Sequence, residues 1–318
     1  MMQTAYAAYG LQLLSTFPLA GMDPDRAENL PSLSLDLQSE GQLAATWNSM
    51  DCPSVWRGRL GDGLDLTIER GVAEDLLFSY GDRARFHLDA SMQSLACVPR
   101  HEGLDWQRTL LSKVIASVSV MRGYEALHAS AIDSPQGVVA ILAPSGAGKT
   151  TLALELMRRG WPLFADDSLT LAHEPGGVRA YPGTPHMNVT EGQMSSMASW
   201  DIGSSLGVMA GECWIVARTT VREARSVRMI CLLTREAGRK LDAQFLSSNP
   251  LRLAPYMLGL RGDTERERSR FALYAELMSS TTLIALGCGE DDKPSEVADL
   301  LERALEDCPS ALAVGETV

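Results

Sequence analysis

The sequence APSGAGKT, residues 143–150, places a lysine and a hydroxyl side chain directly behind a loop of small residues. An apolar, β-branched run precedes the loop at 138–142 and residues with helical spacing follow at 149–159, so we predict a strand, a sharp loop and a helix. Such a loop turns successive backbone N–H groups toward an anion, and the positive end of the helix adds to the attraction. The pattern predicts phosphate binding, with Lys149 on the β- and γ-phosphates and the Thr150 hydroxyl on Mg²⁺. The expected nucleotide-binding residues are Ser145, Gly146, Ala147, Gly148, Lys149, Thr150 and Thr151.

One position departs from the usual phosphate-loop pattern, because Ala143 stands where that pattern has glycine. Alanine is acceptable there if the backbone does not need a positive φ. The plain alternative is a strand-loop-helix connection that contains GKT without binding phosphate. The scarcity of lysine favours phosphate binding, since the chain has only Lys113, Lys149, Lys240 and Lys293.

Two adjacent carboxylates, Asp166 and Asp167, end a further predicted strand at 162–167. The C-terminal ends of strands line the ligand crevice in open α/β sheets, so we expect the pair to face the phosphate loop. Phosphoryl transfer to a hydroxyl needs one group that holds Mg²⁺ and one that accepts the hydroxyl proton. Because neighbouring strand residues point to opposite sides, we expect the carboxylates to divide these tasks. Which one is the base stays open, the assigned metal ligands are Thr150 and Asp167, and a turn cap is the alternative role for one Asp.

These residues together resemble the catalytic half of the bacterial HPr kinase/phosphorylase family. The similarity runs in order from His128 through APSGAGKT, the helix TLALELMRRG and the ADD of Asp166 and Asp167, as far as Tyr181. It implies an α/β fold, with a mixed-sheet P-loop kinase core of the HPr kinase and phosphoenolpyruvate carboxykinase-like type. It also implies ATP with Mg²⁺ as cofactors and phosphorylation of a serine hydroxyl on a protein or peptide. By position, the resemblance implies catalytic roles for His128, Lys149, Asp166 and Asp167.

Several features depart from that family. Thr151 occupies the position where family members have glutamate, and no glycine-rich signature for the reverse, phosphorylase reaction follows Tyr181. The pattern therefore favours the wider set of HPr-kinase-related proteins. Within that set, the front end YAAYGLQLLSTFPLAG and the RGYEALHASA junction resemble kinases of ribosomal peptide maturation, including those that act on lasso-peptide precursors. His128 lies in a run, 127–132, that alternates like a strand, so a packed structural histidine is its alternative role.

Short alternating runs dominate the first third of the chain. We predict strands at 33–37, 65–69, 76–80, 84–88 and 94–98, and therefore a smaller β-rich N-terminal domain over residues 1–98. Its expected role is recognition of the acceptor by strand addition at a sheet edge, with structural support as the alternative. An amphipathic helix at 102–121 is expected to pack on the sheet of the catalytic domain, residues 99–318.

Three further features carry weaker functional expectations. The loop YPGTPH places Thr184 and His186 close to the site in sequence, although a structural turn is the favoured interpretation. Residues 187–207 mix Met and Ser and form a candidate lid. A charged turn is expected to join strands at 213–217 and 227–233; it supplies a candidate arginine finger, with solvated charges as the favoured interpretation. The arginines there are Arg218, Arg222, Arg225 and Arg228.

The remaining elements follow from periodicity. Helices are predicted at 250–260, 263–278 and 295–305, and an apolar strand at 282–286.

Composition narrows the class of partner and the compartment. A net charge of −12 argues against nucleic acid, and 45% hydrophobic residues are enough for a core. No apolar run approaches the roughly 20 residues of a membrane helix, and the start MMQTAYAAYG lacks the basic residues of a signal peptide. Six cysteines without CxxC spacing and five histidines without ligand spacing predict a cytoplasmic, reducing environment and no zinc site.

We therefore expect an ATP- and Mg²⁺-dependent kinase that acts on a serine or another hydroxyl of a small protein or peptide. A lasso-type precursor is the favoured acceptor, no membrane partner is expected, and homo-oligomers are possible. The alternatives are a P-loop nucleotide hydrolase or switch, a non-catalytic module with a degenerate loop, and a kinase of HPr or of a free small molecule.

Overall fold

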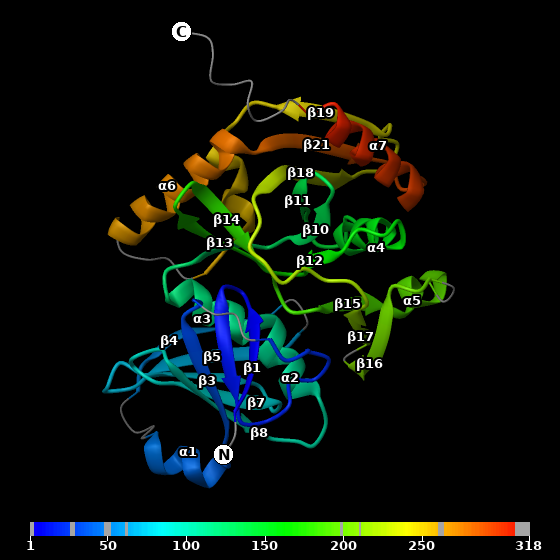
Figure 1. The fold of residues 1–318 in the computed structure, drawn as a ribbon. Helices are drawn as coiled ribbons and strands as arrows, with labels where there is room; N and C mark the ends of the chain where they lie inside the picture. Colours follow the sequence, from blue (N-terminus) through cyan, green and yellow to red (C-terminus); the bar gives the residue numbers. More distant parts are fainter. Residues whose placement is uncertain are drawn as a thin grey trace. The chain divides into compact units, whose positions relative to one another are not determined.

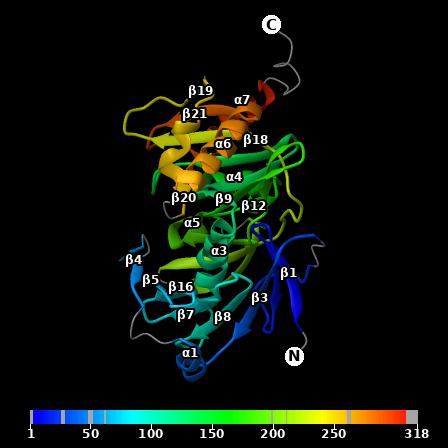
Figure 2. The same cartoon turned by 90° about the vertical axis from the view of Figure 1, so that its left-hand side faces the viewer.

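The computed structural model describes residues 3–25, 29–47, 52–60, 63–197, 200–209, 211–259 and 264–308. The chain divides into two compact units, one of residues 1–122 with 208–210 and one of residues 123–207 with 211–318. Both units are built on β-sheets, so the fold is a mixed α/β one (Figure 1 and Figure 2). Among the described residues, no helix has the length and apolar character that a membrane span needs.

The first unit holds an eight-stranded sheet with the strand order β1-β2-β3-β8-β7-β6-β5-β4. Leu33 and Leu35 show the alternation that forms it, because both are fully buried while the residues between and beside them keep some exposure. A short helix, α1 (Glu40–Thr46), starts with a capping box between Ser39 and Gln42. The predicted strands of this region are confirmed. The strands are Thr4–Ala8 (β1), Leu11–Ser15 (β2), Ser32–Leu37 (β3), Ser54–Arg59 (β4), Asp65–Arg70 (β5), Leu76–Tyr80 (β6), Ala84–Leu88 (β7) and Ser94–Pro99 (β8).

A helical segment completes the first unit. It consists of α2 (Asp105–Thr109), a π-helical turn η2 (Leu110–Val114) and α3 (Ile115–Met121). The segment packs on the β1–β2 hairpin, where the Tyr9 hydroxyl donates to the Leu111 carbonyl at 3.0 Å and the Ser119 hydroxyl donates to the Tyr9 carbonyl at 2.8 Å. The division between the units therefore falls after Arg122 and not after residue 98. The amphipathic stripe showed that one face of this helix is buried, but not which sheet buries it.

Three sheets are described beyond Arg122. The largest has the order β12-β10-β11-β18-β21-β19, and its central strands β11, β18 and β21 run parallel. Its strands are Ser130–Ser134 (β10), Gly137–Leu142 (β11), Leu163–Ala165 (β12), Val227–Arg235 (β18), Asp242–Leu246 (β19) and Thr282–Cys288 (β21). A four-stranded sheet has the order β14-β13-β9-β20 and a three-stranded sheet the order β15-β17-β16. Their strands are Glu125–Leu127 (β9), Leu169–Glu174 (β13), Gly177–Tyr181 (β14), His186–Thr190 (β15), Gly203–Met209 (β16), Glu212–Ala217 (β17) and Met257–Leu258 (β20).

Both faces of the six-stranded sheet are covered. On one face, Val139 and Ile141 of β11 belong to a cluster with residues of α4 (Lys149–Arg158) and α7 (Pro294–Glu306). On the other face, Val138 and Ala140 belong to a cluster with α6 (Thr264–Ser280) and the four-stranded sheet. A strand buried on both faces reads as a continuous apolar run, which is why residues 138–142 lack polar alternation.

Most of the predicted elements of this unit are confirmed, but a predicted hairpin and a predicted α-helix are wrong. The expected hairpin between 213–217 and 227–233 does not form, because β17 lies in the three-stranded sheet while β18 enters the six-stranded sheet between β11 and β21. The predicted helix at 250–260 is a 3-10 helix, η3 (Pro250–Tyr256), followed by the short strand β20. The helix expected from residue 263 is α6, which begins at Thr264, while residue 263 lies outside the described residues.

A buried ion pair ties α6 to β9 and gives a test of the fold. Glu125 and Arg270 are both nearly inaccessible, and Arg270 Nε lies 2.8 Å from a Glu125 carboxylate oxygen. We predict that Glu125→Ala lowers the free energy of unfolding by about 3–5 kcal/mol. The substitution removes the buried carboxylate that pairs with both Arg270 and Arg266, and it leaves the buried Arg270 paired with the half-exposed carboxylate of Glu267. Urea denaturation followed by circular dichroism measures this loss. The control is Arg70→Ala, which breaks an exposed pair with Glu74 and should cost about 1 kcal/mol or less; equal losses in the two variants would contradict the prediction.

Candidate functional site

The loop at 143–148 leaves β11 and leads directly into α4, which begins at Lys149. Gly146 and Gly148 have φ values of 81° and 99°, a region that favours glycine, so both turns of the loop depend on the absence of a Cβ atom. Ala143 is not among the residues with positive φ, which removes the objection to alanine at that position. The local backbone therefore matches what an anion-binding loop requires at each glycine that the sequence retains.

Lys149 is buried at the start of α4, with 9% of its surface exposed. Its Nζ atom donates to the Ser130 hydroxyl oxygen at 3.5 Å and lies 3.7 Å from Asp167 Oδ1. An ammonium group removed from water needs compensating charge or hydrogen bonds, and this site supplies both. Lys149 is thus held in place by residues of β10 and by the chain that follows β12.

Asp166 and Asp167 directly follow β12, which ends at Ala165, whereas the prediction made them the last two residues of a strand at 162–167. The strand alternation expected for the pair does not apply, because Asp167 adopts a left-handed φ of 62° and Ser168 N–H donates to the Asp166 carbonyl at 2.7 Å. This three-residue turn is a strained geometry of the kind that clusters at functional sites. The turn brings both carboxylates into one group with Lys149, whereas a strand would have separated them.

The two carboxylates differ in environment. Asp166 is 7% exposed and accepts a hydrogen bond of 2.5 Å from the Ser130 hydroxyl. Burial, together with the nearby charge of Asp167, raises the pKa of Asp166 to about 6, although Lys149, Ser130 and the Asn188 backbone N–H act in the opposite direction. The Asp167 side chain is 37% exposed. Asp167 is therefore the carboxylate that a ligand can reach directly. Asp166 is buried and acts through its hydrogen bond to Ser130 and its charge beside Lys149 and Asp167.

Two residues of this group were not recognised in the sequence. Ser130 bonds both Asp166 and Lys149, and Asn188 of β15 donates from its side-chain amide to Asp167 Oδ2 at 3.3 Å. Neither belongs to a recognisable motif, and Asn188 reaches the site only because β15 runs past the end of β12. The one available signal was its nearness to the YPGTPH loop.

His128 lies beside the site but not on a strand. The structure ends β9 at Leu127 and begins β10 at Ser130, so the predicted strand at 127–132 is interrupted at His128. His128 N–H donates to the Tyr256 carbonyl at 2.7 Å, and the ring Nδ1–H donates to the Asp167 carbonyl at 3.0 Å. The imidazole therefore supports the strained backbone at Asp167.

Other predicted site residues lie apart from the carboxylates. The Thr151 hydroxyl accepts from Gln193 of α5 (Glu191–Met197) at 2.8 Å, so this residue faces that helix. Thr184 and His186 are 4% and 5% exposed, and the His186 ring stacks on Trp214 with centroids 4.4 Å apart, which agrees with the favoured structural interpretation. The candidate lid at 187–207 forms β15, α5 and the start of β16, with residues 198–199 outside the described part.

Three of the four candidate arginine fingers are held by other groups. Arg218 pairs with Asp201, Arg225 Nη2 lies 3.5 Å from a Glu223 oxygen, and Arg228 donates to the Cys308 carbonyl at 3.0 Å. The first two pairs are exposed, as expected of solvated charges.

The donor set fits Mg²⁺ better than a caged metal. Among the described residues no group of three or more His, Cys, Asp or Glu side chains is placed to hold a metal ion. Mg²⁺ does not need such a cage, because it keeps several waters and is bound by one or two protein groups together with substrate phosphates. A partly exposed Asp167 carboxylate and the Thr150 hydroxyl at the start of α4 meet this requirement.

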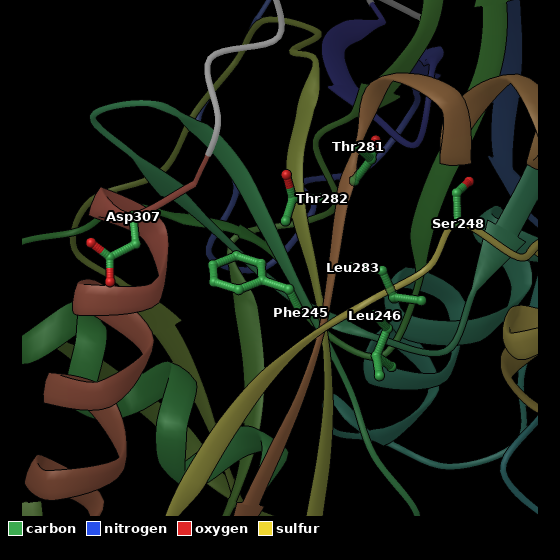
Figure 3. A pocket seen from close by; sticks show the side chains of 7 residues that line it. All are labelled: Phe245, Leu246, Ser248, Thr281, Thr282, Leu283 and Asp307. Atoms are coloured by element: carbon green, nitrogen blue, oxygen red, sulfur yellow. The ribbon is translucent and has the colours of Figure 1, made fainter. Parts of the chain in front are cut away.

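A hollow of about 320 Å³ elsewhere in this unit is a separate feature (Figure 3). Phe245, Leu283 and Asp307 are among the residues that line it. It lies at the N-terminal end of β21, whereas the loop at 143–148 follows the C-terminal end of β11, which runs in the same direction. The hollow and the candidate site are therefore at opposite ends of the parallel strands.

Comparison with known proteins adds one distant similarity. No family model matches the chain, and no curated protein matches it in sequence. Among solved structures, the HPr(Ser) kinase/phosphatase from Coxiella burnetii is similar over 57% of this chain and 91% of its own length, with 10% sequence identity and a TM-score of 0.32.

The raised pKa of Asp166 predicts a dependence of stability on pH. Between the ordinary Asp value of 3.8 and about 6, the folded chain holds a proton at Asp166 that the unfolded chain has released. The contribution of Asp166 to the free energy of unfolding is therefore fully present below pH 3.8. It decreases as the pH rises from 3.8 to about 6, and it does not change further above that pH. Asp166→Asn removes this slope and should raise the free energy of unfolding at pH 8 by up to about 3 kcal/mol.

Urea denaturation at pH 4.5, 6 and 8 measures this effect. The matched control is Asp89→Asn. The pKa of Asp89 is lowered in the folded chain, so above pH 4 this substitution should lower the free energy of unfolding, whereas Asp166→Asn should raise it. A slope between pH 4.5 and 6 that is the same in Asp166→Asn and in the parent would show that Asp166 is not the titrating group.

Proposed function

We propose that the chain is an ATP- and Mg²⁺-dependent phosphotransferase that phosphorylates a hydroxyl, most plausibly of serine, on a small protein or peptide. The observation that carries this proposal is the distance of 3.7 Å between Lys149 Nζ, directly behind the glycine loop, and the Asp167 carboxylate. A phosphate-binding cation and a reachable carboxylate that lie beside each other can act on one transferring phosphoryl group and on its acceptor hydroxyl.

The chain's own residues account for the transfer in simple terms. Loop N–H groups and Lys149 hold the β- and γ-phosphates and offset their negative charge. The acceptor oxygen forms its bond to the γ-phosphorus as the bond from that phosphorus to the bridging oxygen breaks, which leaves ADP. The hydroxyl proton passes to Asp167, whose carboxylate is the exposed member of the pair. Asp166 and Ser130 are positioning residues, because they fix Lys149 and the turn at Asp167 without reaching the acceptor.

The cation has a defined place in this scheme. Mg²⁺ would be held by the Thr150 hydroxyl and the Asp167 carboxylate. When bound, it supplies charge neutralisation on the phosphate oxygens.

A peptide acceptor is supported by the open edge of the first unit. β4 ends the eight-stranded sheet. The bond from Leu60 N–H to the Leu64 carbonyl fixes the alternation of the β4–β5 ladder, so the backbone groups of Arg57 and Arg59 point away from β5. Such an edge accepts an extended chain by strand addition. A precursor of a ribosomally made peptide, of the lasso type, is the acceptor we would offer first.

The kinase assignment is tested by removing its two central groups. Lys149→Ala should lower kcat/KM by about 10²–10³-fold, because it removes a charge from the phosphates. Asp167→Asn should lower kcat by about 10²–10⁴-fold, because it removes the proton acceptor. Mass spectrometry of acceptors incubated with protein, ATP and Mg²⁺ measures phosphoryl transfer, and ADP release is followed in parallel. The acceptors are a lasso-type precursor peptide, an HPr-type protein and free serine.

Asp82→Asn is the matched control, since this carboxylate lies in the first unit with an 84% exposed side chain. A parent-like rate in both Lys149→Ala and Asp167→Asn would overturn the proposal. Release of ADP by the parent protein with no labelled acceptor would replace it with a nucleotide hydrolase or switch.

A further inference from the structure

Arg235 is the last residue of β18, and its side chain lies against the loop at 143–148. The position that a Cβ atom on Gly148 would occupy is 3.7 Å from Arg235 Nε and 3.8 Å from Nη2. Gly148 is the residue at which the loop turns into α4. The guanidinium edge formed by Nε and Nη2 is therefore next to the start of the helix, where the backbone N–H groups of the loop converge.

The guanidinium is held by neutral groups. Its Nη1 atom donates to the carbonyls of Gly289, Glu290 and Asp292, at 2.6, 3.3 and 3.4 Å, in the segment between β21 and α7. No carboxylate lies within ion-pairing distance of Arg235 in the part of the chain that the structure describes. Carbonyl oxygens orient a guanidinium but leave its full positive charge in place, so the loop faces a fixed cation whose charge no residue neutralises.

The strand order shows on which side of the loop the Arg235 guanidinium lies relative to the Asp pair. β11, which carries the loop, has β10 and then β12 on one side and β18 on the other (Figure 1). Asp166 and Asp167 follow β12, so they lie to one side of the loop, and Arg235 lies to the other. An acceptor hydroxyl that gives its proton to Asp167 must also contact the transferable phosphoryl group, so that group lies on the β12 side of the loop. The remaining phosphates of the nucleotide then extend toward β18.

We propose that Arg235 binds the non-transferred phosphates of the nucleotide and anchors them equally before and after transfer. This inference rests on the proposed function, since it assigns a direction to the nucleotide in the same site. Arg235 acts on the bound substrate and product, in contrast to an arginine finger, which stabilises charge on the transferring group. It contributes affinity and register, while Lys149 and Asp167 contribute to the chemical step.

The test uses the full chain and measures the affinity for ADP and for ATP with Mg²⁺ by isothermal titration calorimetry. Arg235→Gln should weaken both nucleotides to the same extent, by about 10–100-fold, as expected for loss of a hydrogen bond between charged groups. Arg235→Lys should recover part of the affinity, because it restores the charge without the paired donors. In steady-state kinetics, Arg235→Gln should raise KM for ATP by a similar factor with little change in kcat.

Arg239→Gln is the matched control. Arg239 lies four residues after Arg235, in the connection from β18 to β19, and it already pairs with Glu236 and Asp242. Arg239→Gln should therefore leave the affinities for ADP and ATP within about twofold of those of the parent. A thermal melt of each variant shows whether the fold survives, because Arg235 also joins β18 to the segment before α7.

The outcomes separate this inference from the proposed function. Tight nucleotide binding by the parent and equal binding by a folded Arg235→Gln variant would overturn the role of Arg235 and leave the phosphotransferase intact. A fall in kcat with unchanged KM would overturn the ground-state role, because Arg235 would then act on the transferring group. Absence of ADP and ATP binding in the parent would overturn the proposed function itself.

Discussion

The candidate site depends on a single electrostatic constraint, which is the burial of the Lys149 ammonium group. A lysine with so little exposure is stable only where opposite charge and hydrogen-bond acceptors surround it. Asp167, Asp166 and Ser130 supply these, and each depends on another member of the group. Keeping these charges together out of water is unfavourable for Asp166, because burial and the neighbouring Asp167 carboxylate disfavour its charged form and raise its pKa. The group holds one cation beside two carboxylates, and the proposed phosphotransferase would use the cation for phosphate and Asp167 for the proton.

The six-stranded sheet makes this arrangement possible. Its parallel strands β11, β18 and β21 end at the same edge, and clusters of apolar side chains fix both faces. The loop after β11, the turn after β12 and Arg235 at the end of β18 are therefore mounted on a rigid support, which is what precise positioning of reacting groups requires. Strain is confined to the turn at Asp167, where the His128 ring and Asn188 hold the backbone and the carboxylate.

The first unit is organised by a different rule. Its strands form one extended mixed sheet that ends in β4, with β3 parallel to both of its neighbours, β2 and β8. The helical segment 105–121 is bonded to the β1–β2 hairpin by buried hydroxyl groups. Its edge strand β4 carries Arg57 and Arg59, and its described residues hold no cluster like that around Lys149. In the proposed function, recognition of the acceptor belongs to the first unit and the chemical step to the second.

The sequence alone determined the elements with a local cause. Glycines that need a positive φ, an apolar run buried on both faces, and a helix that starts at Lys149 are encoded within a few residues, so the loop, β11, α4 and the position of the Asp pair could all be predicted. Tertiary structure decided which distant segments meet. Ser130 and Asn188 join the site, Arg235 lies against Gly148, β17 and β18 separate into different sheets, and helix 105–121 packs on the N-terminal sheet. The physical reason is that hydrophobic burial is not directional: a pattern shows that a face is buried, while only the packed chain shows against what.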